Sequence, residues 1–168
     1  HLYPEHPARE RAGRARGARQ RNRGDGQVAP ALRYELLRQL ADSETPPEVW
    51  FARGDPMSAG SPLGLLAGAL RRALGLLDGE HLDLRRRKLR ARVARHVPEA
   101  ESARVSEFLG ELVGTRFEDA GSVQLRAARQ DPILMGDQMR RAFEDLVAAD
   151  CADRPVLLVL EDLHWGDL

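Results

Sequence analysis

The feature that most constrains the fold is an uninterrupted apolar run, Val156–Leu160, followed at once by two carboxylates, Glu161 and Asp162. An apolar run without polar alternation predicts a strand that is buried on both faces, as in the parallel sheets of α/β proteins. The two acids then lie at the carboxyl end of that strand, where open α/β sheets bind their ligands. The alternative is an ordinary core strand whose acids only cap the next turn.

The residues after the acids make the pattern more specific, because His164, Trp165, Gly166 and Asp167 do not usually follow a buried strand. With the strand and its acids, they resemble the Walker B element of AAA-type, STAND-class P-loop ATPase modules. These modules belong to bacterial multidomain regulators that also carry Ser/Thr kinase, nucleotide cyclase or LuxR-type DNA-binding domains.

The resemblance extends over residues 32–168. Three further segments are similar to the helix after the family's phosphate loop, to its second strand and to the start of its next helix: Leu32–Arg38, Val49–Gly54 and Ser61–Leu66. The resemblance implies an α/β fold, a partial P-loop NTPase parallel sheet with a helical insertion between the second strand and the Walker B strand.

The resemblance also implies roles for the acids. Glu161 matches the acid that holds the magnesium ion of bound ATP, and Asp162 matches the acid that orients the attacking water. Both are therefore expected as metal-binding and catalytic residues, although the usual order in the family is Asp followed by Glu. His164 and Asp167 match the family's His-Trp-x-Asp tail, with either an accessory role in shaping or sensing the site or a structural one.

The phosphate-binding half of such a site is missing. A P-loop needs glycines for close backbone approach, a lysine for the β- and γ-phosphates and a hydroxyl for magnesium. The corresponding segment, Arg23–Pro30, has neither the lysine nor the hydroxyl, and the only lysine of the chain is Lys88. Pro30 also lacks the N–H that a phosphate cradle uses. ATP and magnesium are thus the cofactors of the family, but we expect this chain to bind neither and to be inactive as an ATPase.

A shifted reading frame accounts for the missing loop. A coding sequence for Gly-Thr-Gly-Lys-Ser-Arg-Leu-Arg, read from one base earlier, yields Gly-Asp-Gly-Gln-Val-Ala-Pro-Ala, which is the sequence of residues 24–31. The hypothesis is that residues 1 to about 31 are an out-of-frame translation of a strand and P-loop. Sequencing of the locus tests it.

Composition divides the chain into two parts. Residues 1–31 are rich in arginine, and residues 4–27 contain no Val, Ile, Leu, Met or Phe, so this segment is expected to be disordered. The alternative for it is an arm that binds nucleic acid. Residues 32–168 are expected to be a partial AAA/STAND domain that ends at Walker B. His1 and the end after Walker B lead us to expect a fragment.

Apolar spacing and breaker residues predict the elements of the second part. They are a helix over 32–42, a strand over 48–53, a helix from Ser61 to Gly79, helices over 80–97 and 102–113, a short helix or turn over 122–129, and a helix from Asp131 onward. In the helix closed by Gly79, the residues on one face are predicted to be core: Leu66, Leu70, Ala73 and Leu77.

The cationic residues of 85–92 and the single cysteine are expected to have structural roles and not to form a functional site. The cationic residues of 85–92 are more consistent with a solvated face than with a site for acidic partners. The lone Cys151 excludes an internal disulfide and is expected to be a buried packing residue in a reducing, cytoplasmic environment. Zero net charge and the absence of a long apolar run argue against nucleic-acid binding by this segment and against a membrane span.

Two functions are compatible with the sequence. The first is a fragment of an ATP-binding regulatory module, whose partners are proteins or the other domains of a multidomain regulator of signalling or transcription. The second is a nucleotide-independent helical interaction fragment, a remnant of a pseudo-ATPase.

Overall fold

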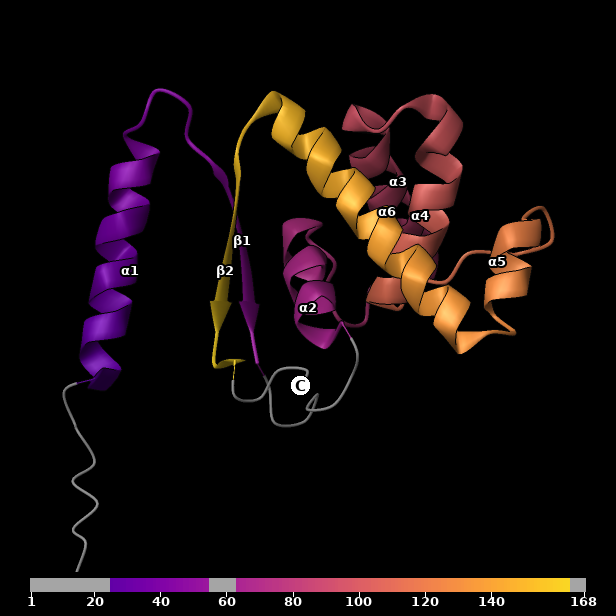
Figure 1. Cartoon of the computed structure of the whole chain (residues 1–168), viewed down its shortest axis with the longest axis horizontal. Helices are drawn as coiled ribbons and strands as arrows, with labels where there is room; N and C mark the ends of the chain where they lie inside the picture. Colours follow the sequence, from indigo (N-terminus) through magenta and orange to yellow (C-terminus); the bar gives the residue numbers. More distant parts are fainter. Residues whose placement is uncertain (1–24, 55–62, 164–168) are drawn as a thin grey trace, which may run out of the picture. The chain divides into compact units, whose positions relative to one another are not determined.

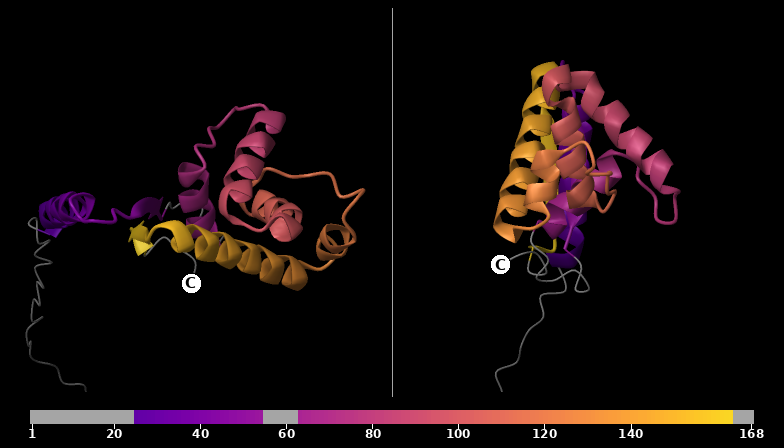
Figure 2. Two further views of the ribbon diagram at one scale, coloured as in Figure 1. Left: turned by 90° about the horizontal axis from the view of Figure 1, so that it is seen from above. Right: turned by 90° about the vertical axis from the view of Figure 1, so that its right-hand side faces the viewer.

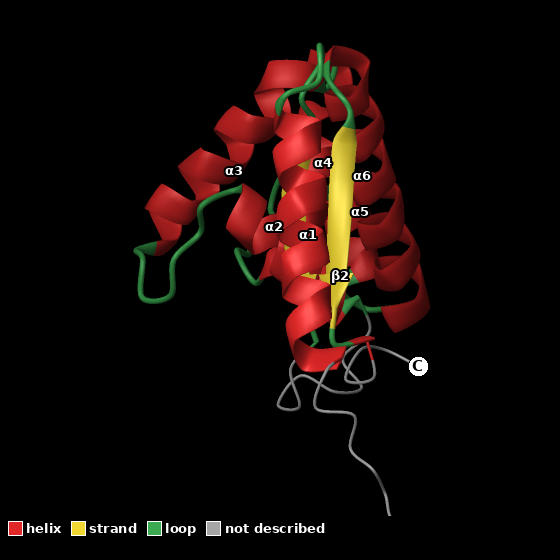
Figure 3. Ribbon diagram, turned by 90° about the vertical axis from the view of Figure 1, so that its left-hand side faces the viewer, coloured by secondary structure: helices red, strands yellow, loops and turns green. Residues whose placement is uncertain are grey.

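The computed structural model describes residues 25–54 and 63–163 of the chain (Figure 1). The chain divides into two compact units, residues 1–38 and 39–168, and each is described by itself. Helix dominates the described residues (Figure 3). The elements in order are α1 (Asp25–Ala41), β1 (Glu48–Arg53), α2 (Gly64–Ala73), α3 (Leu82–His96), α4 (Glu99–Val113), α5 (Val123–Ala128), α6 (Pro132–Asp153) and β2 (Val156–Glu161).

Helix α1 begins at Asp25, earlier than the start at Leu32 that apolar spacing predicts. Residues 25–31, for which we expected no fold, are therefore helical, while residues 1–24 lie outside the described part. In the last turns of α1, Arg38 forms an ion pair with Glu35 at 2.9 Å, the i, i+3 spacing that places two side chains on one helix face.

The two strands form a parallel pair whose register runs from Glu48 beside Val156 to Arg53 beside Glu161. The strand predicted over 48–53 and the strand predicted at Val156–Leu160 are both confirmed, and the elements described between them are helices. The fold is thus mixed α/β, mostly helical, with a two-stranded parallel sheet among the described residues.

The prediction that the strand at Val156–Leu160 is buried on both faces is wrong. In β1, Trp50 and Ala52 are buried, but the residues of β2 are only half-buried, and Leu160 is 39% exposed. In the described part of the chain, β2 pairs with a strand along one edge only. Its second edge is therefore less covered than that of a central strand, which has a neighbour on both edges.

The apolar core is made by the helices together with β1. Helix α6 runs from α5 along α4 and back to the start of β2 (Figure 2). The Trp50 ring meets the edge of Phe143 with centroids 6.1 Å apart, which joins β1 to α6. The large side chains that are completely buried in this core are Leu70, Leu89, Phe108, Leu109, Leu125 and Leu146.

Helix α2 is shorter than predicted. It ends at Ala73 because Gly75, with a φ of 60°, takes the left-handed conformation that stops a helix, and the Leu76 amide donates to the Arg71 carbonyl. The predicted end at Gly79 is therefore wrong, and Leu77, predicted as core, is 64% exposed beyond the helix. Ser61, where the helix was predicted to begin, lies outside the described residues.

The starts of the last two helices agree with their capping residues. Ser122 Oγ accepts a hydrogen bond from the Leu125 amide at 3.2 Å, which caps α5. Asp131 Oδ1 accepts from the amides of Ile133 and Leu134 at the start of α6. These contacts satisfy amides that the first turn of a helix leaves without intrahelical partners.

Four of the cationic residues of 85–92 form hydrogen bonds within the molecule, so the prediction of a solvated face is wrong for Arg85, Arg86, Lys88 and Arg92. Arg85 Nη2 donates to the Val113 carbonyl at 3.0 Å, at the last residue of α4. Arg86 Nε donates to the Arg116 carbonyl at 2.7 Å, and Lys88 binds Glu80. Cations at a helix C-terminus satisfy carbonyls that have no intrahelical donor and complement the helix dipole.

Candidate functional site at the carboxyl end of the sheet

The predicted acids lie where the two strands end together. The register places Arg53, the last residue of β1, beside Glu161, the last residue of β2. The Gly54 amide donates to the Glu161 carbonyl oxygen at 2.9 Å, which extends the strand pairing by one bond beyond β1. Glu161 and Asp162 therefore come at the carboxyl end of a parallel pair, the end where α/β sheets bind ligands.

Asp162 turns the chain away from the strand. Its φ of 52° lies in the left-handed region, which aspartate tolerates better than most residues because its short side chain forms local hydrogen bonds. Arg53 Nε donates to Asp162 Oδ2 at 2.6 Å. The two side chains are 65% and 37% exposed, so solvent screens this ion pair and its contribution to stability is small.

The electrostatics of this corner follow from that pair. The pKa of Arg53 is raised, first by the hydrogen bond to Asp162, next by the Asp162 charge and to a smaller extent by Glu161. The guanidinium offsets one of the two negative charges that a divalent cation would need. Among the described residues, no group of three His, Cys, Asp or Glu side chains could hold a metal ion.

The structure describes only part of the other segments named for the predicted site. His164 and Asp167 lie outside the described residues, as does Arg23. Residues 25–30 form the first turns of α1. Lys88, the only lysine of the sequence, lies in α3, where its ammonium donates to the Gly75 carbonyl at 2.6 Å and to Glu80.

A cluster of charged side chains at the opposite, amino end of the strands was missed from the sequence. Arg92 Nη2 donates to both carboxylate oxygens of Glu48 at 2.8 Å and to Asp150 Oδ2 at 2.6 Å. Arg154 and the Trp50 indole also donate to Glu48. The cluster joins β1, α3 and α6, and its signal in the sequence is an acid, Asp150, on an otherwise apolar helix face.

Burial and charge act against each other in this cluster. Burial alone would raise the pKa of Glu48, but the hydrogen bonds from Arg92, Trp50 and Arg154 outweigh it, and the pKa lies below the ordinary value. Burial likewise acts to lower the pKa of Arg92, and its bonds to Glu48 and Asp150 raise it overall. Glu48 and Arg92 are therefore held in their charged forms, within a network that links β1, α3 and α6.

Cys151 does not have the packing role expected from the sequence. It is a free, exposed cysteine on α6, next to Asp150, which is buried. None of the helices in the described ranges is both long enough and apolar enough to cross a bilayer.

No protein-family model matches this chain, and comparisons with curated proteins and with solved structures find no match.

Proposed function

We propose that the chain is part of an AAA-type, STAND-class ATP-binding regulatory module, in which it supplies the second strand, the helical insertion and the Walker B strand. In this proposal Glu161 is the acid that holds magnesium, and Asp162 orients water. The observation that carries the proposal is the parallel pairing of β1 and β2, with both acids at the end of the strands where such sheets bind ligands.

The proposal includes the loss of activity in this chain. Arg23–Pro30 stands in the place of the phosphate loop and has no lysine or hydroxyl residue. Arg53 also pairs with Asp162 at 2.6 Å, which competes with a divalent cation for that carboxylate. A magnesium half-site without a phosphate half-site cannot position ATP for hydrolysis. The partners of the chain are then the other domains of a regulator, in which ATP occupancy switches the output.

Calorimetric titration with magnesium and ATP tests the proposal. The chain as it stands is expected to give no heat of binding. A synthetic gene that reads the segment before Leu32 one base out of its present frame, and so encodes Gly-Thr-Gly-Lys-Ser-Arg-Leu-Arg in place of residues 24–31, is expected to give magnesium-dependent binding in the micromolar range.

If the frame-shifted chain binds ATP with magnesium, that binding is expected to depend on Glu161. In the frame-shifted chain, Glu161→Ala is expected to abolish binding. The matched control is Glu118→Ala, because Glu118 is an exposed glutamate in the loop after α4. If the frame-shifted chain binds no ATP, or if Glu161→Ala and Glu118→Ala behave alike, the assignment of the acids is wrong.

A second candidate is a nucleotide-independent helical interaction fragment, the remnant of a pseudo-ATPase. The ion pair of Arg53 with Asp162 favours it, because a paired carboxylate has a structural role in the corner without any ligand. On this alternative, changing the reading frame before Leu32 produces no ATP binding at all, so the same titration separates the two candidates.

A further inference from the structure

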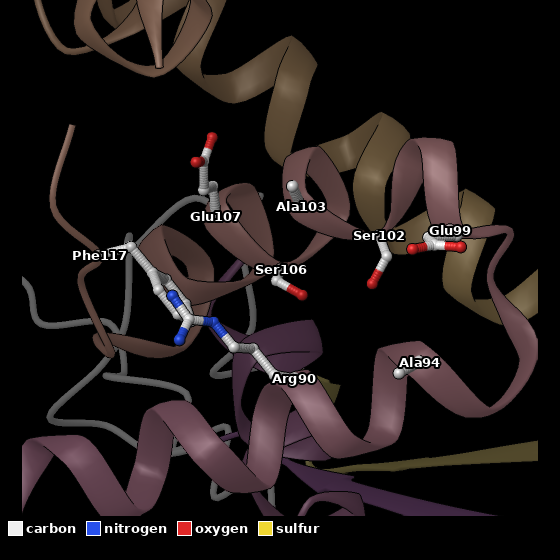
Figure 4. A pocket seen from close by; sticks show the side chains of 8 residues that line it. All are labelled: Arg90, Ala94, Glu99, Ser102, Ala103, Ser106, Glu107 and Phe117. Carbon is white, nitrogen blue, oxygen red and sulfur yellow. The ribbon is translucent and has the colours of Figure 1, made fainter. Parts of the chain in front are cut away.

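Figure 4 shows a cavity of about 330 Å³ between α3 and α4, but its lining does not favour one class of ligand. Two glutamates, Glu99 and Glu107, and one cation, Arg90, line the cavity, so charges of both signs lie around it. The Ser106 hydroxyl is buried and out of reach of a ligand. The edge of β2, in contrast, presents backbone donors and acceptors in a fixed order.

The hydrogen bonds between the strands show which residues of β2 point to its open edge. The Glu48 amide donates to the Pro155 carbonyl at 2.8 Å, and the Gly54 amide donates to the Glu161 carbonyl at 2.9 Å. Backbone groups of successive residues in a strand alternate between its two edges, so the odd-numbered residues of β2 face β1. The N–H and C=O groups of the even-numbered residues therefore point to the opposite edge, which has no strand neighbour among the described residues. These residues are Val156, Leu158 and Leu160.

This open edge lacks the features that usually prevent strand edges from pairing between molecules. Natural edge strands carry charged residues or proline, or are distorted by bulges. The run Val156–Leu160 contains no charged residue and no proline, its register with β1 is continuous, and Leu160 is 39% exposed. Pro155 precedes the run but faces β1, so its missing amide does not interrupt the open edge. The edge can therefore accept another strand.

The same strand from a second copy of the chain fits this edge. In an antiparallel pair, two residues that exchange hydrogen bonds must both direct their backbone groups toward the partner strand. Antiparallel pairing about Leu158 meets this condition, because Leu158 then lies opposite itself and Val156 lies opposite Leu160. A helix cannot take the place of this strand, because its N–H and C=O groups bond to one another. Residues 4–27 contain no Val, Ile, Leu, Met or Phe from which to form an apolar strand.

The same register brings opposite charges together at both ends of the strand. Arg154 comes opposite Asp162 of the second copy, and the two-fold symmetry repeats this contact. Arg154 donates to Glu48 through Nη2, and Asp162 accepts from Arg53 through Oδ2. The side chains of Arg154 and Asp162 are 49% and 37% exposed, which leaves room for a second partner. The net charge of the chain is zero, so two copies do not repel each other as a whole.

We propose that β2 pairs antiparallel with β2 of a second copy of this chain, about a two-fold axis at Leu158, and that the two copies form a symmetric dimer with a four-stranded sheet. Asp162 then accepts from Arg53 of its own chain and from Arg154 of the second copy. The interface is a strand edge, and its small area is typical of transient complexes. The dimer needs no nucleotide, so the inference does not rest on the ATP-module proposal.

Sedimentation equilibrium of the full chain tests the dimer. A monomer–dimer equilibrium is expected, with a dissociation constant on the order of tens of micromolar for so small an interface. Leu160→Lys places a charge opposite Val156 of the second copy and is expected to weaken the dimer about tenfold. The matched control is Leu77→Lys, because Leu77 is also a leucine and is 64% exposed beyond α2. This control is expected to leave the dissociation constant unchanged.

Exchanging the charges distinguishes this pairing from other modes of association. Arg154→Glu and Asp162→Arg are each expected to weaken the dimer about threefold, because exposed ion pairs contribute little. The double variant is expected to recover the dissociation constant of the parent chain. Arg154 and Asp162 lie about 26 Å apart along one strand, so a contact within one chain cannot produce this recovery. Urea unfolding of each variant shows that it is folded.

Amide hydrogen exchange of the parent chain tests the edge without any substitution. It is measured by NMR at concentrations well below and well above the dissociation constant. The amides of Leu158 and Leu160 are expected to be protected only at the higher concentration. Those of Leu157 and Val159, which face β1, are expected to be protected at both.

Three results would overturn the proposal. The first is a chain that stays monomeric at the higher concentration. The second is protection of the Leu158 and Leu160 amides at both concentrations, which would mean that another segment of the same chain covers the edge. The third is a double variant that associates no better than the single variants, which would mean that copies associate through a different surface.

Discussion

Gly110 in α4 occupies a position with no room for a side chain. A Cβ there would lie 2.6 Å from the Thr115 carbonyl oxygen and 2.7 Å from the Phe117 ring. The Thr115 amide donates to the Gly110 carbonyl at 2.7 Å, so the chain after α4 folds directly back over this residue. The close approach fixes the position of Phe117, which is buried against the hairpin of α3 and α4.

Gly110→Ala is therefore expected to destabilise the fold. Backbone and ring atoms must shift to admit the methyl group, at a cost of about 1–3 kcal/mol for overpacking, against a gain of at most about 1 kcal/mol in helix propensity. Urea denaturation followed by the fluorescence of buried Trp50 measures the change.

Gly136→Ala is the matched control for this substitution. Gly136 also lies inside a helix, α6, but a Cβ there has no atom within 4 Å. The change is expected to stabilise the chain by about 0.5–1 kcal/mol through helix propensity alone. If both alanine variants shift the unfolding midpoint in the same direction, the close approach at Gly110 does not affect the stability of the fold.

Residue identity alone predicted the position of the acids but not their environment. The apolar run before Glu161 located the strand end correctly. The partner of Asp162, however, is Arg53, which is 109 positions away in the sequence, and nothing in the local pattern around Arg53 indicates that contact. The parallel register of the strands brings the two residues together, and the periodicity of apolar residues cannot predict that register.

At the scale of elements, the cluster around Glu48 connects the start of β1 to α3 and α6. Glu48 and Asp150 share Arg92 as donor, and the side chains of these three residues are 16%, 2% and 11% exposed. Removing one partner from a buried ion pair leaves an uncompensated charge, which costs more than the pair itself contributes. The cluster therefore makes the packing of three elements depend on ionisation.

Acid is expected to weaken this connection. The folded pKa of Glu48 lies below its unfolded value of about 4.3, so the ionised carboxylate stabilises the fold fully above that pH. The stabilisation is lost as the pH falls from there through the folded pKa. Urea unfolding between neutral pH and about pH 3 should show a decreasing free energy of unfolding.

Glu48→Gln isolates the part of this loss that belongs to Glu48. The variant is expected to be less stable than the parent at neutral pH and to lose less stability in acid. Glu118→Gln is the control, because Glu118 is 88% exposed, and it should follow the parent curve. Parallel curves for the parent and Glu48→Gln would contradict a role for this carboxylate in acid unfolding.

The helices and strands were easier to predict from the sequence than the contacts between them. Capping residues and breakers act within a few positions, so the strand over 48–53 and the start of α6 follow from the sequence. The predicted end of α2 was wrong because the sequence offers two glycine stops, Gly75 and Gly79. Both have a positive φ, and it is the hydrogen bond from the Leu76 amide to the Arg71 carbonyl that ends the helix at the first of them. The prediction for the α3 arginines was wrong for another reason, because the acceptors of Arg85, Arg86 and Arg92 on other segments lie 28 to 58 positions away.

At the scale of the whole molecule, charge is balanced. The sequence has 26 basic and 26 acidic side chains, so no net field attracts a polyanion. In the described part of the chain, the most cationic element, α3, directs Arg85, Arg86 and Arg92 to acceptors inside the molecule. Among the described residues, the exposed arginines of α3 and α6 that have no internal acceptor are a source of phosphate contacts, and the sequence of residues 1–31 supplies further arginines.

The full chain is therefore expected not to bind duplex DNA at about 150 mM salt, measured by fluorescence polarisation of a labelled oligonucleotide. Without a net field, and with Arg85, Arg86 and Arg92 of α3 paired internally, few clustered cations remain to release the counterions that drive such binding. A chain that begins at Leu32 is the matched comparison. Salt-dependent binding by the full chain alone would assign residues 1–31 to a nucleic-acid-binding arm, and binding by both chains would mean that the pairing within α3 does not hold in solution.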